Sequence, residues 1–309
     1  MPLCLVYQAK LRRRFSGMKT LLQKKFIISF AHLLFGLCFL AACGQDTSPP
    51  TTPTGGSTEP KQVTIQLKHD PSGNADLKWN AQSHELSVTL ALHGLQVKTT
   101  HPAHIHSGSC SKPGATVYTL DNVVADADGN ASVTTVIKDV ANGIPANGWY
   151  INVHNGPEMT TPEQMMGITC GDISNPKAAT TTDQSVTVTM AGTPEPNQSA
   201  SGTAQLTLSA TALTVNITLN GLVANSTHMA HIHDGNCHKQ GKIAFTLKPI
   251  VADASGIGHS TTEIPLTSLT SLSDKRPLYI NVHFGATMQD LKTQPGYDSI
   301  ACGDVVGLY

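Results

Sequence analysis

A histidine-rich motif occurs twice in this chain with the same internal spacing. The first copy reads HPAHIHSGSC and begins at His101, and the second reads HMAHIHDGNC and begins at His228. A YINVH segment follows each copy and ends in His154 or in His283. Imidazole and thiol groups at a recurring spacing are the side chains of metal sites and disulfides, so the sequence predicts two sites of similar build.

The two histidines of each HIH segment are candidates to share one metal ion. Residues i and i+2 of a strand point to the same face of a sheet, so the two imidazoles of each HIH segment project together. The YINVH segment also alternates like a strand, and its final histidine can supply a third ligand at the same sheet end. The predicted ligand sets are His104, His106 and His154 in the first copy, and His231, His233 and His283 in the second.

Three neutral imidazoles suit copper or zinc better than magnesium or calcium, which prefer oxygen ligands. The general order of affinities favours copper over zinc. Met159 and Met288 each lie five residues after the third histidine, and a thioether is a soft donor that favours Cu(I). We therefore predict one copper ion per repeat, with these methionines as possible extra ligands or, alternatively, as side chains that fill gaps.

His101 and His228 lie at an odd offset from the HIH segments, which turns them to the other face of the strand. We assign them a supporting role beside the ligands, with direct ligation as the alternative. The alternative for the HIH pairs is that they bind no metal and are surface residues or hydrogen-bonded structural residues. Five further histidines have no counterpart in the other copy and are expected to be ordinary surface or loop residues: His69, His84, His93, His238 and His259.

The cysteines fit an oxidising compartment. Four of the seven fall in the two repeats at matching positions, which predicts one disulfide per repeat, Cys110 with Cys170 and Cys237 with Cys302. Thiolate metal ligands are the alternative, but the chain contains no C-x-x-C spacing in this region.

The N-terminal segment has the features of an export signal. Residues 1–43 contain seven basic and no acidic residues, and an apolar run too short to span a bilayer comfortably leads to LAAC, which resembles the bacterial lipobox. We expect Cys43 to be lipidated, with an ordinary small-residue cleavage site as the alternative, and translation to begin at Met1 or Met18. Residues 44–60 are rich in Thr and Pro and predict a flexible tether, so we expect an extracytoplasmic protein anchored in the cell membrane or outer membrane.

The charge of the mature chain argues against one class of partner. Removing the seven basic residues of the leader from the chain's 20 leaves 13 against 21 acidic residues, a formal charge of −8. An acidic chain without a basic stripe has no electrostatic footprint for nucleic acid. We therefore expect no nucleic-acid binding.

The two motif copies belong to two copies of one domain. His104, Cys110 and Gly94 recur 127 residues later, which predicts a tandem duplication with domains at residues 61–174 and 184–309 and a linker at 175–183. Leucine, valine and isoleucine alternate with polar residues in both copies, and Gly, Asn, Pro and Asp clusters separate these runs. The pattern predicts an all-β chain with two antiparallel Greek-key sandwich or barrel domains.

The order of motifs resembles the copper/zinc superoxide dismutase family. The matching features are the alternating strand, the HxxHIHxGxC segment, VADAxG, the final VH and CGD. In that family the HxH pair and the later histidine bind copper, and the two cysteines form a disulfide. The resemblance implies a superoxide dismutase-like fold and the same copper ligands and disulfide pairs as those given above.

The chain departs from that family at two functional places. The loop that carries the bridging histidine and zinc ligands is reduced to a few residues after Cys110, and Gly167 and Ser299 stand where the active-site arginine is expected. Zinc binding in the family's manner is therefore not expected, and we expect copper binding, storage or transfer to copper-handling proteins rather than catalysis. A reduced copper-only dismutase is the alternative.

The YINVH phrasing also resembles the CHRD domain, an extracellular β-domain with HIH and NVH motifs. That resemblance implies a further alternative, a surface interaction module in which the histidines are structural.

Overall fold

The computed structural model describes residues 60–265, 267 and 276–308. The predicted signal peptide, Cys43 and nearly all of the tether lie outside these residues. Within the described part of the chain, no helix is long and apolar enough to cross a membrane.

Strands make up most of the first repeat. Its elements are β1 (Lys61–Lys68), β2 (Ser72–Asn80), β3 (Glu85–His93), β4 (Thr100–His101), β5 (Ala103–Ser109), β6 (Lys112–Thr119), β7 (Val123–Val124), β8 (Ala131–Ile137), β9 (Trp149–His154), α1 (Pro162–Met165) and β10 (Gly167–Ile173).

The second repeat gives the same series of strands and an additional 3-10 helix, η2, before its α-helix. They are β11 (Gln184–Met190), β12 (Ser201–Leu208), β13 (Ala212–Asn220), β14 (Thr227–His228), β15 (Ala230–Asn236), β16 (Lys239–Thr246), β17 (Ile250–Ala252), β18 (Gly258–Pro265), β19 (Leu278–His283), η2 (Asp290–Lys292), α2 (Gln294–Tyr297) and β20 (Ser299–Val305). The all-β prediction is confirmed.

The strands pair antiparallel throughout the described sheets. One group of sheets has the orders β11-β2-β3-β8, β10-β9-β5-β6 and β4-β7, and the other is a single sheet of order β14-β17-β18-β13-β12-β1-β20-β19-β15-β16. Each group encloses its own apolar core. The alternation predicted from the sequence fills these cores: Leu86, Val88, Leu90 and Leu92 are at most 3% exposed.

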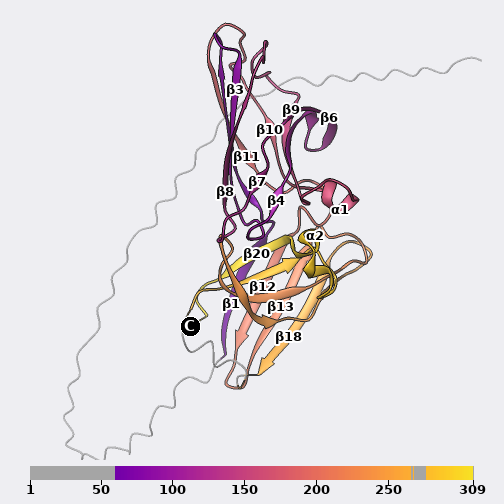
Figure 1. Ribbon diagram of the computed structural model, residues 1–309. Helices are drawn as coiled ribbons and strands as arrows, with labels where there is room; N and C mark the ends of the chain where they lie inside the picture. The colour runs from indigo at the N-terminus through magenta and orange to yellow at the C-terminus, as the bar shows by residue number, and fades with distance from the viewer. Residues whose placement is uncertain (1–59, 266, 268–275, 309) are drawn as a thin grey trace, which may run out of the picture. The chain divides into compact units, whose positions relative to one another are not determined.

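The first strand of each repeat lies in the sheet of the other repeat. β1 pairs along its whole length with β12, and β11 pairs with β2 (Figure 1, where β1 is the indigo strand beside β12). Ile65 and Leu67 accordingly belong to the second core, and Val188 and Met190 to the first. The boundaries 61–174 and 184–309 remain a prediction for the repeats, but each core combines strands from both segments.

Each exchanged strand also meets the strand that carries the second cysteine of a disulfide. Lys68 pairs with Cys302, and Ala191 pairs with Cys170. These contacts make Lys68 and Ala191 equivalent positions, so the exchange follows the pseudo-symmetry of the duplication.

Candidate metal sites

Each HIH strand lies between its hairpin partner and the YINVH strand. β5 pairs with β6 on one side and with β9 on the other, and β15 pairs in the same way with β16 and β19. The third histidine ends the neighbouring strand, where the backbone N–H of His154 donates to Pro102 O at 2.9 Å. The register therefore brings all three predicted ligands of each repeat to one sheet end.

The first triad is compact. The ring centroids of His104 and His106 are 5.5 Å apart, those of His104 and His154 are 5.2 Å apart, and those of His106 and His154 are 5.9 Å apart. One ring nitrogen from each histidine lies within 4.8 Å of the other two. The arrangement could hold one metal ion.

The second triad repeats this geometry closely. The ring centroids of His231, His233 and His283 are separated by 5.6, 5.2 and 5.7 Å. Its ligand nitrogens also lie within 4.8 Å of one another. The sequence prediction that these six residues come together as two sets of three agrees with the described geometry.

Backbone carbonyls set the tautomer of two histidines in the first triad. His106 Nδ1 lies 3.2 Å from Gly114 O, and His154 Nδ1 lies 2.7 Å from Met165 O. A carbonyl only accepts hydrogen bonds, so each Nδ1 carries the proton and each Nε2 keeps its lone pair. The second triad has both equivalent bonds. His233 Nδ1 lies 3.0 Å from Gly241 O, and His283 Nδ1 lies 2.7 Å from Tyr297 O.

Several ring nitrogens of the triads are buried without a hydrogen-bond partner among the described residues. A buried nitrogen without a partner costs about 1 to 3 kcal/mol, and a metal ion would remove that cost. The atoms are His104 Nδ1, His106 Nε2, both ring nitrogens of His231, His233 Nε2 and His283 Nε2. His154 Nε2 has only a 3.5 Å contact with Asn152 Nδ2.

Burial favours the neutral form of His104, His154 and the three histidines of the second triad. Desolvation, with a smaller contribution from the neighbouring imidazoles of each triad, lowers the pKa of His154 to about 4 and that of His283 to about 3. Desolvation likewise lowers the pKa of His231 to about 4. Neutral imidazoles present the lone pairs that a metal ion needs at neutral pH.

The two triads differ in accessibility. His104 and His106 are partly exposed, and a cavity of about 210 Å³ opens beside His106 and His154. The three histidines of the second triad are fully buried. The first site is therefore open to solvent and the second is closed.

Other methionines than those predicted lie beside the first triad. Met165 and Met166 line its cavity, whereas Met159 is not among the lining residues. Met288 in the second repeat is 51% exposed. Sequence reasoning missed Met165 and Met166, although their position directly before β10 was a usable signal, because β10 pairs with the strand that ends in His154.

His101 and His228 each donate a hydrogen bond to the backbone carbonyl of the third histidine of a triad. His101 Nδ1 donates to His154 O at 3.0 Å, and its Nε2 lies 2.7 Å from Thr99 Oγ1. The second copy repeats both contacts, with His228 Nδ1 3.1 Å from His283 O. Both ring nitrogens are engaged in each case, which suits the supporting role.

The disulfides join the predicted pairs. Cys110 bonds to Cys170 and Cys237 to Cys302, each with a Cα–Cα distance of 6.0 Å. Each bond links the turn after the HIH strand to the CGD strand. The aspartate of CGD strengthens the link, because Asp172 Oδ1 accepts from Cys110 N at 2.7 Å and Asp304 does the same for Cys237 at 2.8 Å.

The five remaining histidines do not all behave as expected. His84 stacks on Trp79 with ring centroids 6.0 Å apart, and His259 is exposed. His69 lies in the loop after β1 as expected, but it is only partly exposed and its Nε2 lies 2.7 Å from Ile168 O. His93 and His238 meet each other across the two repeats, which their unmatched positions in the sequence did not suggest.

Comparison with known proteins agrees with the CHRD resemblance. No curated protein matches the chain in sequence. A family model of the CHRD domain matches residues 42–157 and 177–287, so each match contains one complete histidine triad. The two matches cover more than half of the chain. The chain therefore belongs to the CHRD domain family and carries two CHRD domains in tandem.

Proposed function

We propose that each histidine triad binds one copper ion and that the protein is an extracytoplasmic copper-binding lipoprotein. The observation that supports this most is the set of converging imidazole nitrogens that are buried without partners. The carbonyl bonds to the opposite ring nitrogens orient them, as in protein metal sites generally.

The donor set favours copper over other ions. Three neutral nitrogen donors exclude a preference for magnesium or calcium, and copper stands above zinc in the general affinity order. Met165 lines the first cavity and offers a soft thioether donor there, whereas Met166 Sδ accepts a hydrogen bond from Gln198 Nε2 at 3.4 Å. Bound copper would supply one-electron redox chemistry, while the protein's own part is to hold the three imidazoles neutral and oriented.

Copper stoichiometry tests this proposal. Purified full chain, loaded with copper and dialysed, should retain about two copper ions per chain by elemental analysis. The double variant His104→Ala and His106→Ala should retain one, and His231→Ala with His233→Ala should also retain one. His259→Ala, at an exposed histidine outside the triads, should still retain two.

Circular dichroism and intact disulfides must show that the variants fold. Retention of no copper by the folded parent would contradict the proposal. Equal copper content in the folded parent and the triad variants would contradict it as well.

The difference in burial favours storage in one site and exchange in the other. A chelator or a copper-handling partner can reach the open first triad, whereas the closed second triad must open before it releases its ion. Copper removal by a Cu(I) chelator should therefore show a fast and a slow phase of equal size. The His104→Ala and His106→Ala variant should lack the fast phase; loss of the slow phase instead would oppose this assignment.

Superoxide dismutation is a second candidate, favoured by the cavity that opens onto the first triad. The missing arginine weakens it, because no cation stands at Gly167 to attract the superoxide anion. A side chain at this position would also have to displace the side chain of Asn152, whose Oδ1 would lie 2.4 Å from the added Cβ. Copper-loaded protein should dismutate superoxide slowly, and the His104→Ala and His106→Ala variant should remove that activity. Equal rates in the parent and the variant would exclude dismutation by the first triad, and copper binding would remain as the proposed function.

We further propose that a lipid on Cys43 anchors the chain to a bacterial membrane. The disulfides and the CHRD domains are compatible with an extracytoplasmic location. Cys43→Ser should move the protein from the membrane fraction to the soluble fraction of expressing cells. Unchanged fractionation would contradict the anchor.

A further inference from the structure

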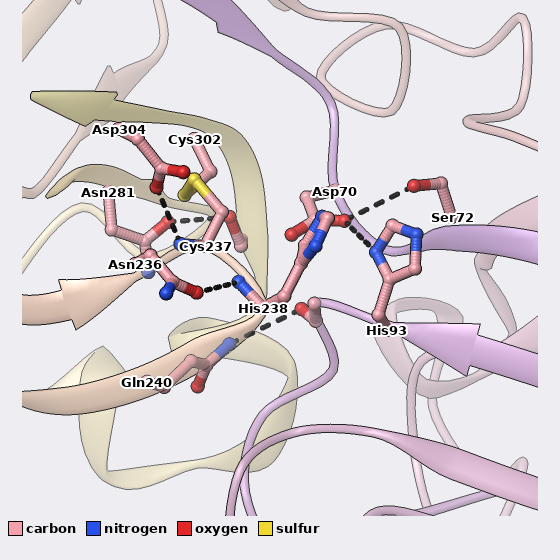
Figure 2. The surroundings of a disulfide bond; sticks show 12 residues. Asp70, Ser72, His93, Asn236, Cys237, His238, Gln240, Asn281, Cys302 and Asp304 are labelled. Atoms are coloured by element: carbon pink, nitrogen blue, oxygen red, sulfur yellow. Dashed lines mark hydrogen bonds and ion pairs between the residues drawn. A yellow bond between two sulfur atoms is a disulfide. The ribbon is translucent and has the colours of Figure 1, made fainter. Parts of the chain in front are cut away.

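We infer that Asp70, His93 and His238 form a third metal site, for a zinc-class divalent cation, built from both repeats. Asp70 lies in the β1–β2 connection and His93 ends β3, both in the first repeat, and His238 lies in the β15–β16 turn of the second. Figure 2 shows the three side chains grouped beside the Cys237–Cys302 disulfide. This site lies outside both histidine triads and does not depend on the copper proposal.

The three side chains already lie at metal-binding distances. Each offers one ligand atom, and these atoms lie within 4.8 Å of one another. His93 Nδ1 is 3.4 Å from Asp70 Oδ1, and the ring centroids of His93 and His238 are 3.8 Å apart with an interplanar angle of 43°. Two imidazoles and a carboxylate in such close contact form a compact donor set for one ion.

The carboxylate of Asp70 is buried and has few partners among the described residues. Asp70 is only 5% exposed, and among the described residues its only ion-pair partner is His93. Ser72 Oγ is its hydrogen-bond donor, at the long distance of 3.4 Å. Since a buried carboxylate is costly unless it is paired, a bound cation would offset that cost.

The nitrogen facing this carboxylate is also without a hydrogen bond. His93 Nδ1 is buried and has no hydrogen-bond partner among the described residues. Gly94, with φ +77°, leaves room for the carboxylate, because a side chain at this position would overlap Asp70. The backbone thus accommodates the acid beside an imidazole nitrogen that is available to a metal.

Several contacts hold His238 against the first repeat. Asn130 Nδ2 donates to His238 O at 3.3 Å, and Gln240 Nε2 donates to Gly94 O at 3.4 Å. Lys239 Nζ lies 3.8 Å from Asp128 Oδ2. These bonds, together with the disulfide at Cys237, position the turn independently of any ion.

The duplication does not produce this donor set by itself. The 127-residue offset makes Asn220 the counterpart of His93 and Ser111 the counterpart of His238. The equivalence of Lys68 and Ala191 makes Thr193 the counterpart of Asp70. The fold accepts amide and hydroxyl side chains at these positions, so the three potential ligands are a particular feature of this junction.

One carboxylate oxygen and two imidazole nitrogens suit zinc with a water as the fourth ligand. A cavity of about 250 Å³, lined by Ser72, Asp70 and His238 among others, adjoins the set and can admit that water. Because the ligands come from both repeats, a bound ion would fasten the repeats to each other.

The test uses zinc itself and the full, disulfide-bonded chain. Zinc binding is measured by calorimetry on chain that has first been given two equivalents of Cu(I), enough for the two triads only, because this soft ion does not favour a carboxylate ligand. The test variants are His93→Asn and His238→Ser, which introduce the residues that the other repeat carries at the same positions. His259→Asn is the matched control at an exposed histidine.

Each test variant should lose one equivalent of zinc, or bind it more weakly by more than about tenfold, with unchanged copper content. The control should bind zinc like the parent. Zinc binding that is equal in parent and folded test variants would overturn the proposal, and so would an equal loss in the control. Failure of the copper proposal would show instead in the triad variants, so the two results are separable.

Discussion

The six triad histidines fall into two kinds according to the ring nitrogen that the protein leaves free. His106, His154, His233 and His283 each give Nδ1 to a backbone carbonyl and keep Nε2 for a ligand. The first histidine of each HIH segment has no such carbonyl, and its Nδ1 is buried without a hydrogen-bond partner among the described residues. A metal ion in either triad would therefore meet oriented lone pairs, which lowers the cost of reorganisation on binding.

The buried His101 should make the stability of the fold sensitive to acid. Desolvation lowers its pKa to about 4, against about 6.5 in an unfolded chain. Between these values the unfolded state binds a proton that the folded state does not, so stability falls as the pH falls through this window. The expected contribution is about 1.4 kcal/mol per pH unit.

Urea unfolding at pH 7, 6 and 5, with a chelator present, measures this effect. His101→Gln should flatten the pH dependence by about that amount, and His259→Gln should not change it. An equal slope in parent and His101→Gln would show that the buried imidazole does not control acid stability.

At the scale of elements, the exchanged strands predict that a mutation in one repeat weakens the other. Ile65 lies in the first repeat's sequence but packs in the second core. Ile65→Ala should destabilise the protein by about 2 to 5 kcal/mol. Hydrogen exchange should increase mainly in β12 and β13, since β12 is the partner of β1 and pairs with β13.

Val188→Ala is the matched variant for the reverse exchange, because Val188 packs in the first core. It should increase exchange in β2 and β3. If Ile65→Ala instead loosened β2, β1 would pair within its own repeat in solution, contrary to the structure.

The disulfides act at this scale as well. Cys110 and Cys170 are 60 residues apart, and closing a loop of that length contributes about 4 kcal/mol in the chain-entropy model. The variant Cys110→Ser with Cys170→Ser should lose about that much stability in chemical unfolding. Its copper stoichiometry should be preserved where it remains folded, because neither cysteine belongs to a triad; loss of copper by a folded variant would make the disulfide part of the site.

For the molecule as a whole, copper should act as a stabilising ligand. A ligand that binds only the folded state at 100 times its Kd stabilises by about 2.7 kcal/mol. The melting temperature should therefore rise on copper loading and return to the apo value when a chelator removes the ion. An unchanged melting temperature with both sites occupied would mean that the unfolded chain holds copper equally well.

The two repeats of this chain are joined by contacts as well as by the linker. The exchanged strands and the turn that carries His238 connect the two repeats through hydrogen bonds and an ion pair. The set of Asp70, His93 and His238 forms only where the two repeats meet. A site of this kind depends on both domains being present in one chain.

The sequence by itself determined the all-β class, the duplication, the two triads and the two disulfide pairs. These features depend on local rules, since alternation defines strands, an i, i+2 spacing places His104 and His106 together, and recurrence at a constant offset identifies equivalent residues. Only the tertiary structure decided the strand exchange, the closure of the second triad, the place of Met165 and the meeting of Asp70, His93 and His238. β1 could pair with either neighbour by its pattern alone, because alternation states which face of a strand is buried but not which sheet buries it. Contacts between residues distant in sequence make that choice, and they bring together side chains whose spacing along the chain carries no signal.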